Sequence, residues 1–302
     1  MNKQTERNLK IKRARRYRLV FFLLFFLIIS MVLFLLAYFL IPAKDITNFG
    51  DNTDATAPSQ ENSETAGESD PSSTQAVQSE APVDKYDEYS YTFSADLSSY
   101  EQYMNPHNDD YLFLVNVDNK LQENYIPDDL TDVVYTRDDG RNTQQMRLYA
   151  EKALEALFIE AEAQGMTYVN PKSGYGLSVM SAYRSYAYQK QLFDQRVAST
   201  GSEEAASKIV QYQGACEHQS GLCCDMHNLS SADESYESDA SAKWLAENSY
   251  KFGFILRYPK DKTEITGISF EPWHFRFVGR YHASKMYELG MCLEEYMEYI
   301  KK

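Results

Sequence analysis

Hydrophobic and polar positions divide the chain into three stretches of different character. Residues 19–41 carry no charge and consist mostly of Leu, Phe, Ile and Val, with no polar face anywhere along the run. Roughly 20 apolar residues span a bilayer as a helix, so the pattern predicts one transmembrane helix rather than a buried core helix. Residues 42–88 contain almost no large apolar residue, whereas residues 89–302 show the mixed pattern of a folded domain.

The pattern within residues 89–302 predicts short strands separated by helices. Between residues 141 and 164 apolar side chains recur every three or four positions, and Gly165 supplies a stop. Further helices are expected at 186–198, 203–211 and 240–250. Short apolar or aromatic runs predict strands at 111–117, 177–182, 222–226, 254–257 and 268–278. Helices that precede and separate short strands indicate the α+β class.

Residues 42–88 have the composition of a disordered linker. They hold eleven acids and two lysines among many Ser, Thr, Gln and Ala residues. Such a segment cannot bury enough apolar surface to offset the entropy of ordering it. As a flexible coil it has a root-mean-square span of roughly 40 Å. We therefore expect a stalk between the apolar span and the folded domain.

Charge is distributed unevenly around the apolar span. The chain has a formal net charge of -14, yet residues 1–18 carry eight basic residues and one acid. Basic residues before a span predict a cytoplasmic N-terminus, which places the rest of the chain outside. A cleaved signal peptide is the alternative, but its apolar region is normally about 7–15 residues. The overall acidity argues against a nucleic-acid partner.

The four cysteines do not form a disulfide framework by their spacing. Cys216, Cys223, Cys224 and Cys292 are expected to be small buried apolar residues. One disulfide is the alternative, and its pairing does not follow from the sequence. Neighbouring Cys223 and Cys224 would point to opposite faces of a strand.

Two histidine-containing segments are candidates for a metal site. His218, Asp225 and His274 would supply two imidazoles and a carboxylate, the ligand types of catalytic zinc. Glu271 precedes His274 by three positions, and Pro272 disfavours a helix there. A turn could still bring the Glu271 carboxylate beside a water on the metal, as general base and then general acid. On spacing alone, structural histidines explain the same pattern.

Several ordered motifs resemble those of the VanY-type D-alanyl-D-alanine carboxypeptidases, zinc enzymes of the LAS group. The resemblance covers about residues 108–282. It rests on SAYRS at 181–185, EHQSG at 217–221 with Asp225, GFILRYP at 253–259, and EPWHFRFVG at 271–279. It implies a small antiparallel sheet with helices packed around it.

The resemblance also implies roles for individual residues. His218, Asp225 and His274 would bind one zinc ion per domain, with Glu271 as the catalytic base. Arg184 would face the scissile carbonyl, where a guanidinium stabilises a developing oxyanion. We expect the substrate site to include four further residues: Tyr183, Gln189, Cys216 and Trp273.

This chain departs from the family pattern at three places. Cys216 stands where serine is usual, Cys223-Cys224 where Ala-Val is common, and Phe277 where tyrosine is common. Because a thiol is a weak donor, Cys216 puts the usual serine hydrogen bond in doubt. A thiol beside zinc could also be an additional ligand. The other histidines, His107, His227 and His282, fall outside the metal motif.

The expected function is a membrane-anchored D,D-carboxypeptidase that removes the terminal D-Ala from peptidoglycan stem peptides. Its catalytic domain would lie outside the bacterial cell membrane, held to the bilayer by the N-terminal helix. An L,D-carboxypeptidase acting on tetrapeptide stems is one alternative. A non-catalytic cell-wall-binding module is the other. The sequence does not give the oligomeric state.

Overall fold

The computed structural model describes residues 84–207 and 209–302. The predicted cytoplasmic tail (1–18), transmembrane helix (19–41) and most of the stalk (42–88) lie outside these residues. Within the described part of the chain, no helix combines the length and apolarity needed to cross a membrane.

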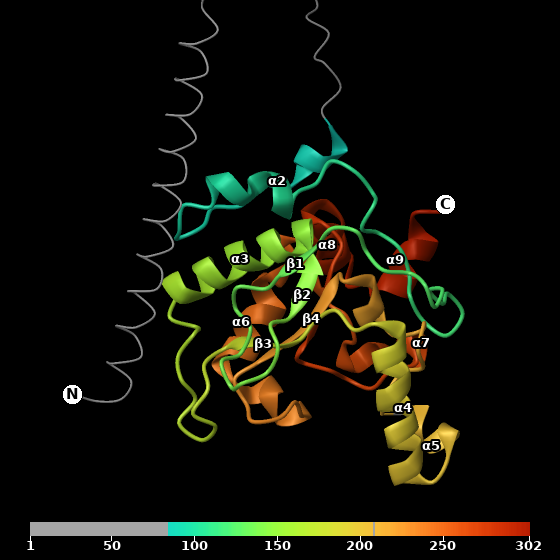
Figure 1. The fold of residues 1–302 in the computed structure, drawn as a ribbon. Helices are drawn as coiled ribbons and strands as arrows, with labels where there is room; N and C mark the ends of the chain where they lie inside the picture. The colour runs from blue at the N-terminus through green and yellow to red at the C-terminus, as the bar shows by residue number, and fades with distance from the viewer. Residues whose placement is uncertain (1–83, 208) are drawn as a thin grey trace, which may run out of the picture. The chain divides into compact units, whose positions relative to one another are not determined.

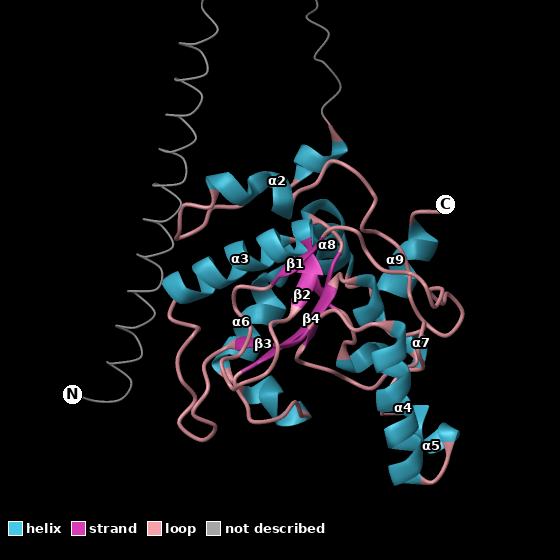
Figure 2. Cartoon of the chain, in the orientation of Figure 1, coloured by secondary structure: helices cyan, strands magenta, loops and turns pink. Residues whose placement is uncertain are grey.

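A four-stranded antiparallel sheet forms the centre of the domain (Figures 1 and 2). Its spatial order is β3 (Ser178–Ser181), β4 (Cys223–His227), β6 (His274–Phe277) and β5 (Phe254–Leu256). A separate two-stranded sheet joins β1 (Leu130–Asp132) to β2 (Gln145–Arg147). The structure thus has the α+β class and the small antiparallel sheets expected from the sequence.

The two faces of the four-stranded sheet differ in chemistry. Cys224 pairs with Phe275, and both belong to the main hydrophobic core. Asp225 pairs with His274, and neither belongs to that core. Since side chains alternate between the faces of a strand, one face packs on the core and the other carries polar and charged groups.

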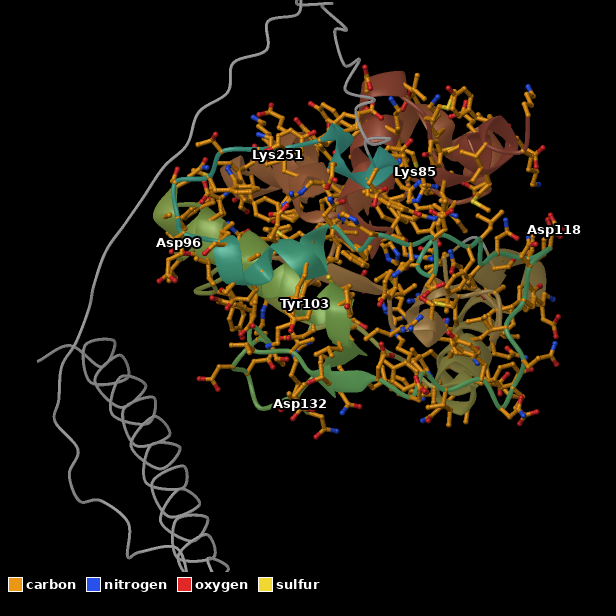
Figure 3. All side chains as sticks on the ribbon, turned by 90° about the horizontal axis from the view of Figure 1, so that it is seen from above. Lys85, Asp96, Tyr103, Asp118, Asp132 and Lys251 are labelled. Carbon is orange, nitrogen blue, oxygen red and sulfur yellow. The ribbon has the colours of Figure 1, made fainter. Side chains whose placement is uncertain are left out.

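Helices surround the sheet. Their bounds are α2 (Glu101–Met104), α3 (Leu148–Ala163), α4 (Tyr186–Thr200), α5 (Glu203–Ser207), α6 (Ala240–Asn248), α7 (Thr263–Thr266), α8 (Arg280–Leu289) and α9 (Leu293–Tyr299). The main core joins α3 and α6 to the apolar face of the sheet. Leu293 and Tyr296 of α9 form a second cluster with Ala283 and Met286 of α8. Figure 3 shows the domain from above, with Tyr103 of α2 over α3, where its ring meets Tyr149 edge-on at 5.2 Å.

Helix α3 confirms the main helical prediction but begins later than expected. It starts at Leu148 rather than 141, because Gln145–Arg147 pairs with β1 instead. Its buried side chains include Leu154, Leu157 and Phe158. Gly165 follows the helix with φ of 75°, a left-handed conformation that glycine adopts without steric cost.

The predicted strand at 111–117 is wrong. Tyr111 lies in a turn, residues 112–115 form no regular element, and Asn116 and Val117 lie in a bend. Two carbonyls of this segment, those of Tyr111 and Phe113, accept hydrogen bonds from the Arg276 guanidinium at 3.1 and 2.9 Å. A side chain from β6 therefore satisfies the groups that a neighbouring strand would otherwise pair.

Other boundaries are shorter than predicted. The helix expected at 203–211 ends at Ser207, although Ser202 caps it by accepting from the Ala205 backbone N–H at 3.2 Å. The helix expected at 240–250 ends at Asn248 and continues as a 3-10 turn, Ser249–Phe252. Only His274–Phe277 of the apolar stretch 268–278 is a strand, because a turn precedes it.

Ordered structure begins before residue 89. Lys85–Glu88 forms a short 3-10 helix that buries Tyr86. The Tyr86 hydroxyl donates to Asp109 at 2.6 Å, and Asp109 lies 2.8 Å from the Nε2 atom of His282. These hydrogen bonds link the start of the domain, through Asp109, to His282 of α8.

The Arg276 guanidinium, which is fully buried, gives a test of the fold. Arg276→Met would remove its ion pair with Glu217 and the donor to the carbonyls of Tyr111 and Phe113. We expect the free energy of unfolding to fall by about 3–5 kcal/mol, measured by urea denaturation with tryptophan fluorescence. Lys190→Met, in an exposed pair with Asp194, is the control and should cost under about 1 kcal/mol. Equal losses of unfolding free energy in the two variants would contradict the stabilising role of the buried Arg276 guanidinium.

Candidate active site

Three predicted metal ligands converge on the polar face of the sheet. The register of β4 and β6 places Asp225 opposite His274, and their Oδ1 and Nδ1 atoms lie 3.1 Å apart. His218 comes from the 3-10 turn Glu217–Ser220 that precedes β4. Its Nε2 atom lies 3.4 Å from Oδ2 of Asp225. The two imidazole rings meet edge-on, with centroids 5.0 Å apart.

Gly221 makes this approach possible. It ends the turn that carries His218 with φ of 69°. An added Cβ would meet side-chain atoms of Leu130, Arg147 and Pro127 at 3.0 to 3.3 Å. The chain can therefore bend from the turn into β4 only with a residue that tolerates both the left-handed backbone and the close packing.

A second contact lies behind each imidazole, a hydrogen bond for His218 and a longer ion-pair contact for His274. The Nδ1 atom of His218 lies 2.6 Å from the carbonyl oxygen of Ala182. A carbonyl only accepts, so Nδ1 carries the proton and Nε2 is left facing Asp225. The Nε2 atom of His274 faces Oε2 of Glu217 at 3.6 Å, leaving its Nδ1 toward Asp225. Such outer contacts orient metal-binding histidines.

Glu217 is the buried carboxylate behind the site. Its Oε1 atom accepts hydrogen bonds from Arg257 at 2.8 Å and from Arg276 at 2.9 Å. Burial alone would raise the pKa of Glu217, but Arg257, Arg276 and His274 together hold that pKa well below its usual range. An ionised carboxylate therefore stands behind His274. The sequence placed Glu217 in a motif without giving it this role.

Glu271 reaches the ligands through a tight turn. The His274 backbone N–H donates to the Glu271 carbonyl at 3.1 Å, with Pro272 at the second position, where proline favours a turn. The Oε2 atom of Glu271 lies 3.6 Å from Nδ1 of His274. Burial raises the pKa of Glu271 most, and the charge of Asp225 adds to this effect. Its side chain is 25% exposed and lines the cleft described below.

Arg184 contacts the same oxygen of Asp225, Oδ2, that faces His218. Its guanidinium donates to Ser181 Oγ at 2.9 Å, to Gln189 Oε1 at 3.2 Å and to Asp225 Oδ2 at 3.1 Å. The Arg184 backbone N–H donates to the His218 carbonyl at 3.1 Å. The end of β3 and the turn that bears His218 are thus joined directly.

The electrostatics of the site fit a bound cation. Burial and Arg184 lower the pKa of His218, but the charges of Cys223 and Asp225 outweigh them and raise it to about 10. The pKa of His274 is also raised, against the effect of burial, by Cys223 and Asp225. Both rings are therefore held where positive charge is favoured. Two imidazoles and a carboxylate are also the donor set of catalytic zinc, so these residues fit that metal.

These groups form one wall of a cleft of about 1040 Å³. The residues predicted to bind substrate, Tyr183, Gln189, Cys216 and Trp273, all line it. Gln189 is 1% exposed and donates through Nε2 to the Gln211 carbonyl at 2.8 Å. Its Oε1 atom accepts from the Arg184 guanidinium, so we infer that Gln189 positions Arg184 and does not bind a ligand directly.

Several other residues of the cleft were not predicted from the sequence. Arg141, Gln144, Gln145, Gln211 and Tyr258 line it as well. Tyr258 belongs to the matched segment at 253–259, which was the one signal available for it. The glutamines come from segments with no motif, so the sequence gave no indication of their place.

The remaining histidines lie elsewhere among the described residues. His107 pairs with Asp84 at 2.9 Å on the surface, and His282 contacts Asp109 and Tyr296. His227 is buried on β4, where its Nδ1 atom accepts from the Leu229 backbone N–H at 3.1 Å. Burial and the nearby Arg137 lower the pKa of His227 to about 4, so it is neutral near pH 7.

All four cysteines are buried and none is paired in a disulfide. The expectation of small buried residues is confirmed, and the alternative of one disulfide is not supported by the structure. Cys216 stands at the start of the turn that carries His218, and Cys292 caps α9.

Comparison with known proteins agrees with this geometry. A family model described as VanY, D-alanyl-D-alanine carboxypeptidase, matches residues 143–280, which include every residue predicted for the site. YodJ of Bacillus subtilis strain 168, described as a carboxypeptidase, is 40% identical over 207 residues, covering 67% of this chain and 71% of YodJ. A D-alanyl-D-alanine carboxypeptidase of Enterococcus faecalis strain ATCC 700802 / V583 is 39% identical over 167 residues, covering 52% of this chain and 57% of that protein.

Solved structures with similar sequence and fold include the LdcB LD-carboxypeptidase. The LdcB LD-carboxypeptidase, described with the molecular basis of peptidoglycan recognition, is 37% identical and has a TM-score of 0.57. The match covers 64% of this chain and 88% of LdcB. Together with the family match and the geometry above, these similarities identify the chain as a member of the VanY family of D-alanyl-D-alanine carboxypeptidases, zinc peptidases of the LAS group.

Proposed function

We propose that this protein is a membrane-anchored zinc D,D-carboxypeptidase that removes the terminal D-Ala from peptidoglycan stem peptides. The observation that carries the proposal is the convergence of His218, Asp225 and His274 beside Glu271, in the wall of a large cleft. His218, Asp225 and His274 would hold the zinc ion. Bound there, zinc would polarise the scissile carbonyl and lower the pKa of a water molecule.

Glu271 is the proton-transfer group. Its carboxylate lies at the edge of the ligand set and remains accessible from the cleft. The raised pKa brings it nearer the range in which a carboxylate can both accept and return a proton. Glu271 would take a proton from the attacking water and deliver it to the amine of the departing D-alanine.

Arg184 is the group that stabilises the oxyanion. A guanidinium has five N–H donors, and three of them contact Ser181, Gln189 and Asp225. These contacts hold the group rigid at the cleft wall. The remaining donors can then bind a carbonyl oxygen as it gains negative charge. Because these donors are already in position, they stabilise the transition state without a rearrangement of the site.

L,D-carboxypeptidase activity is also supported by a similar protein. LdcB, an LD-carboxypeptidase by name, shares 37% identity and covers most of the described domain. The D,D-specific assignment is supported by the family description and by the Enterococcus faecalis relative. We propose D,D-specificity as the main activity and cleavage of tetrapeptide stems as the alternative.

Glu271→Gln gives a direct test of the catalytic assignment. Removing a positioned acid–base group should lower kcat about 10²–10⁴-fold, while zinc content, measured by atomic absorption, stays at one ion per domain. Glu264→Gln, on the exposed surface of α7, is the matched control and should leave kcat unchanged. Parental turnover in the Glu271 variant would remove Glu271 from the mechanism.

Product analysis separates the two specificities. The purified protein is incubated with a pentapeptide and with a tetrapeptide stem, and the products are read by mass spectrometry. We expect loss of one D-Ala from the pentapeptide, with the resulting tetrapeptide left intact. Faster trimming of the tetrapeptide would assign the L,D-activity instead.

The proposed anchor has an independent test. We expect the full chain to remain with the bacterial membrane after high-salt and alkaline washing, and to be released by detergent. External protease should remove the domain while leaving the basic N-terminus protected. Recovery of the intact chain in the wash would contradict the uncleaved transmembrane helix.

A further inference from the structure

Cys223 occupies an unusual place for a buried cysteine. It lies two residues before Asp225 on β4, so the two side chains share one face of the strand. Neighbouring Cys224 points to the other face and belongs to the main hydrophobic core. Cys223 is fully buried but belongs to neither hydrophobic cluster. Its surroundings are therefore those of the polar site rather than those of the core.

The sulfur atom is close to both imidazole ligands. One donor atom each from His218, Cys223 and His274 lie within 4.8 Å of one another, and all three residues are buried. The same two histidines also contact Asp225 at 3.1 and 3.4 Å. The donor atoms that lie within 4.8 Å of one another thus include the sulfur of Cys223, whereas Asp225 contacts the two histidines separately, through its two oxygens.

We propose that the sulfur of Cys223 is a further protein donor to the metal, beside His218 and His274. The inference rests on the proposed function, because it uses the same metal and the same histidines. Zinc accepts nitrogen, oxygen and sulfur donors. On coordination the thiol releases its proton to solvent, since the thiolate is the metal-binding form.

A sulfur donor changes what the site can do. Three protein ligands leave a position open for water or substrate, whereas four close a tetrahedral set. With Cys223 engaged, the chain would retain metal strongly in its resting form. Substrate or water would then have to compete with the sulfur for its position. Sulfur also favours softer metals than a site of nitrogen and oxygen alone.

Cobalt(II) substitution tests the proposal with a spectroscopic readout. The full-length protein is stripped with a chelator and titrated with cobalt(II). Thiolate coordination produces an intense near-ultraviolet charge-transfer band, which histidine and carboxylate ligands do not. We expect the band at one cobalt per domain in the wild type and in Cys224→Ala, the buried neighbour that serves as control. We expect the band to be lost in both Cys223→Ala and Cys223→Ser, with the visible bands of bound cobalt retained.

The outcomes separate this proposal from the proposed function. Visible cobalt bands without a charge-transfer band in the wild type would overturn the sulfur donor and leave the metal site intact. A band that persists in the Cys223 variants but disappears in Cys216→Ala would assign the sulfur to Cys216 and overturn it equally. Failure of the folded wild type to bind cobalt at all would instead contradict the metal site, and with it the proposed function. Serine has nearly the same volume as cysteine. Cys223→Ser therefore tests the loss of the sulfur even if the smaller side chain of Cys223→Ala disturbs folding.

Discussion

The register between β4 and β6 is the constraint on which the site depends. It places Asp225 opposite His274, with Cys224 opposite Phe275 one step away. A slip of one residue would exchange the two faces of a strand. It would turn the carboxylate into the hydrophobic core and an apolar side chain into the cleft. Burial of Cys224, Met226, Phe275 and Phe277 in one core therefore also fixes which side chains face the substrate.

A buried charge network ties this register to the rest of the domain. Glu217 stands behind His274 and is held by Arg257 and Arg276, and Arg257 also pairs with Glu294 of α9 at 2.6 Å. Removing one partner from such a network leaves an uncompensated buried charge, which is strongly destabilising. The same charged groups that lie behind His274 therefore also hold the segment at 111–117 and the C-terminal helix in place. Stability and site geometry are coupled through these few residues.

The parts of the structure that the sequence predicted are those that local pattern or a motif determines. The strands at 177–182 and 222–226, and the body of α3, follow from apolar runs and helical spacing. The convergence of His218, Asp225 and His274 was predicted from ordered motifs, since spacing alone left structural histidines equally possible.

What the sequence could not predict depends on distant partners. The segment at 111–117 has the composition of a strand, but its carbonyls bond to a side chain 163 to 165 residues later. Helix α8 was missed because it buries polar residues such as Arg280, His282 and Ser284 on its inner face. The role of Glu217 depends on arginines 40 and 59 residues away. The position of the Cys223 sulfur beside both histidines likewise emerges only when β4, β6 and the preceding turn are assembled.

Anomalous diffraction at the zinc absorption edge, from crystals of the zinc-loaded protein, tests the central claim most directly. The account predicts one strong peak about 2.0–2.2 Å from Nε2 of His218, Nδ1 of His274 and the carboxylate of Asp225. A peak that lies away from all three of these residues, or no peak near them in fully loaded crystals, would contradict it.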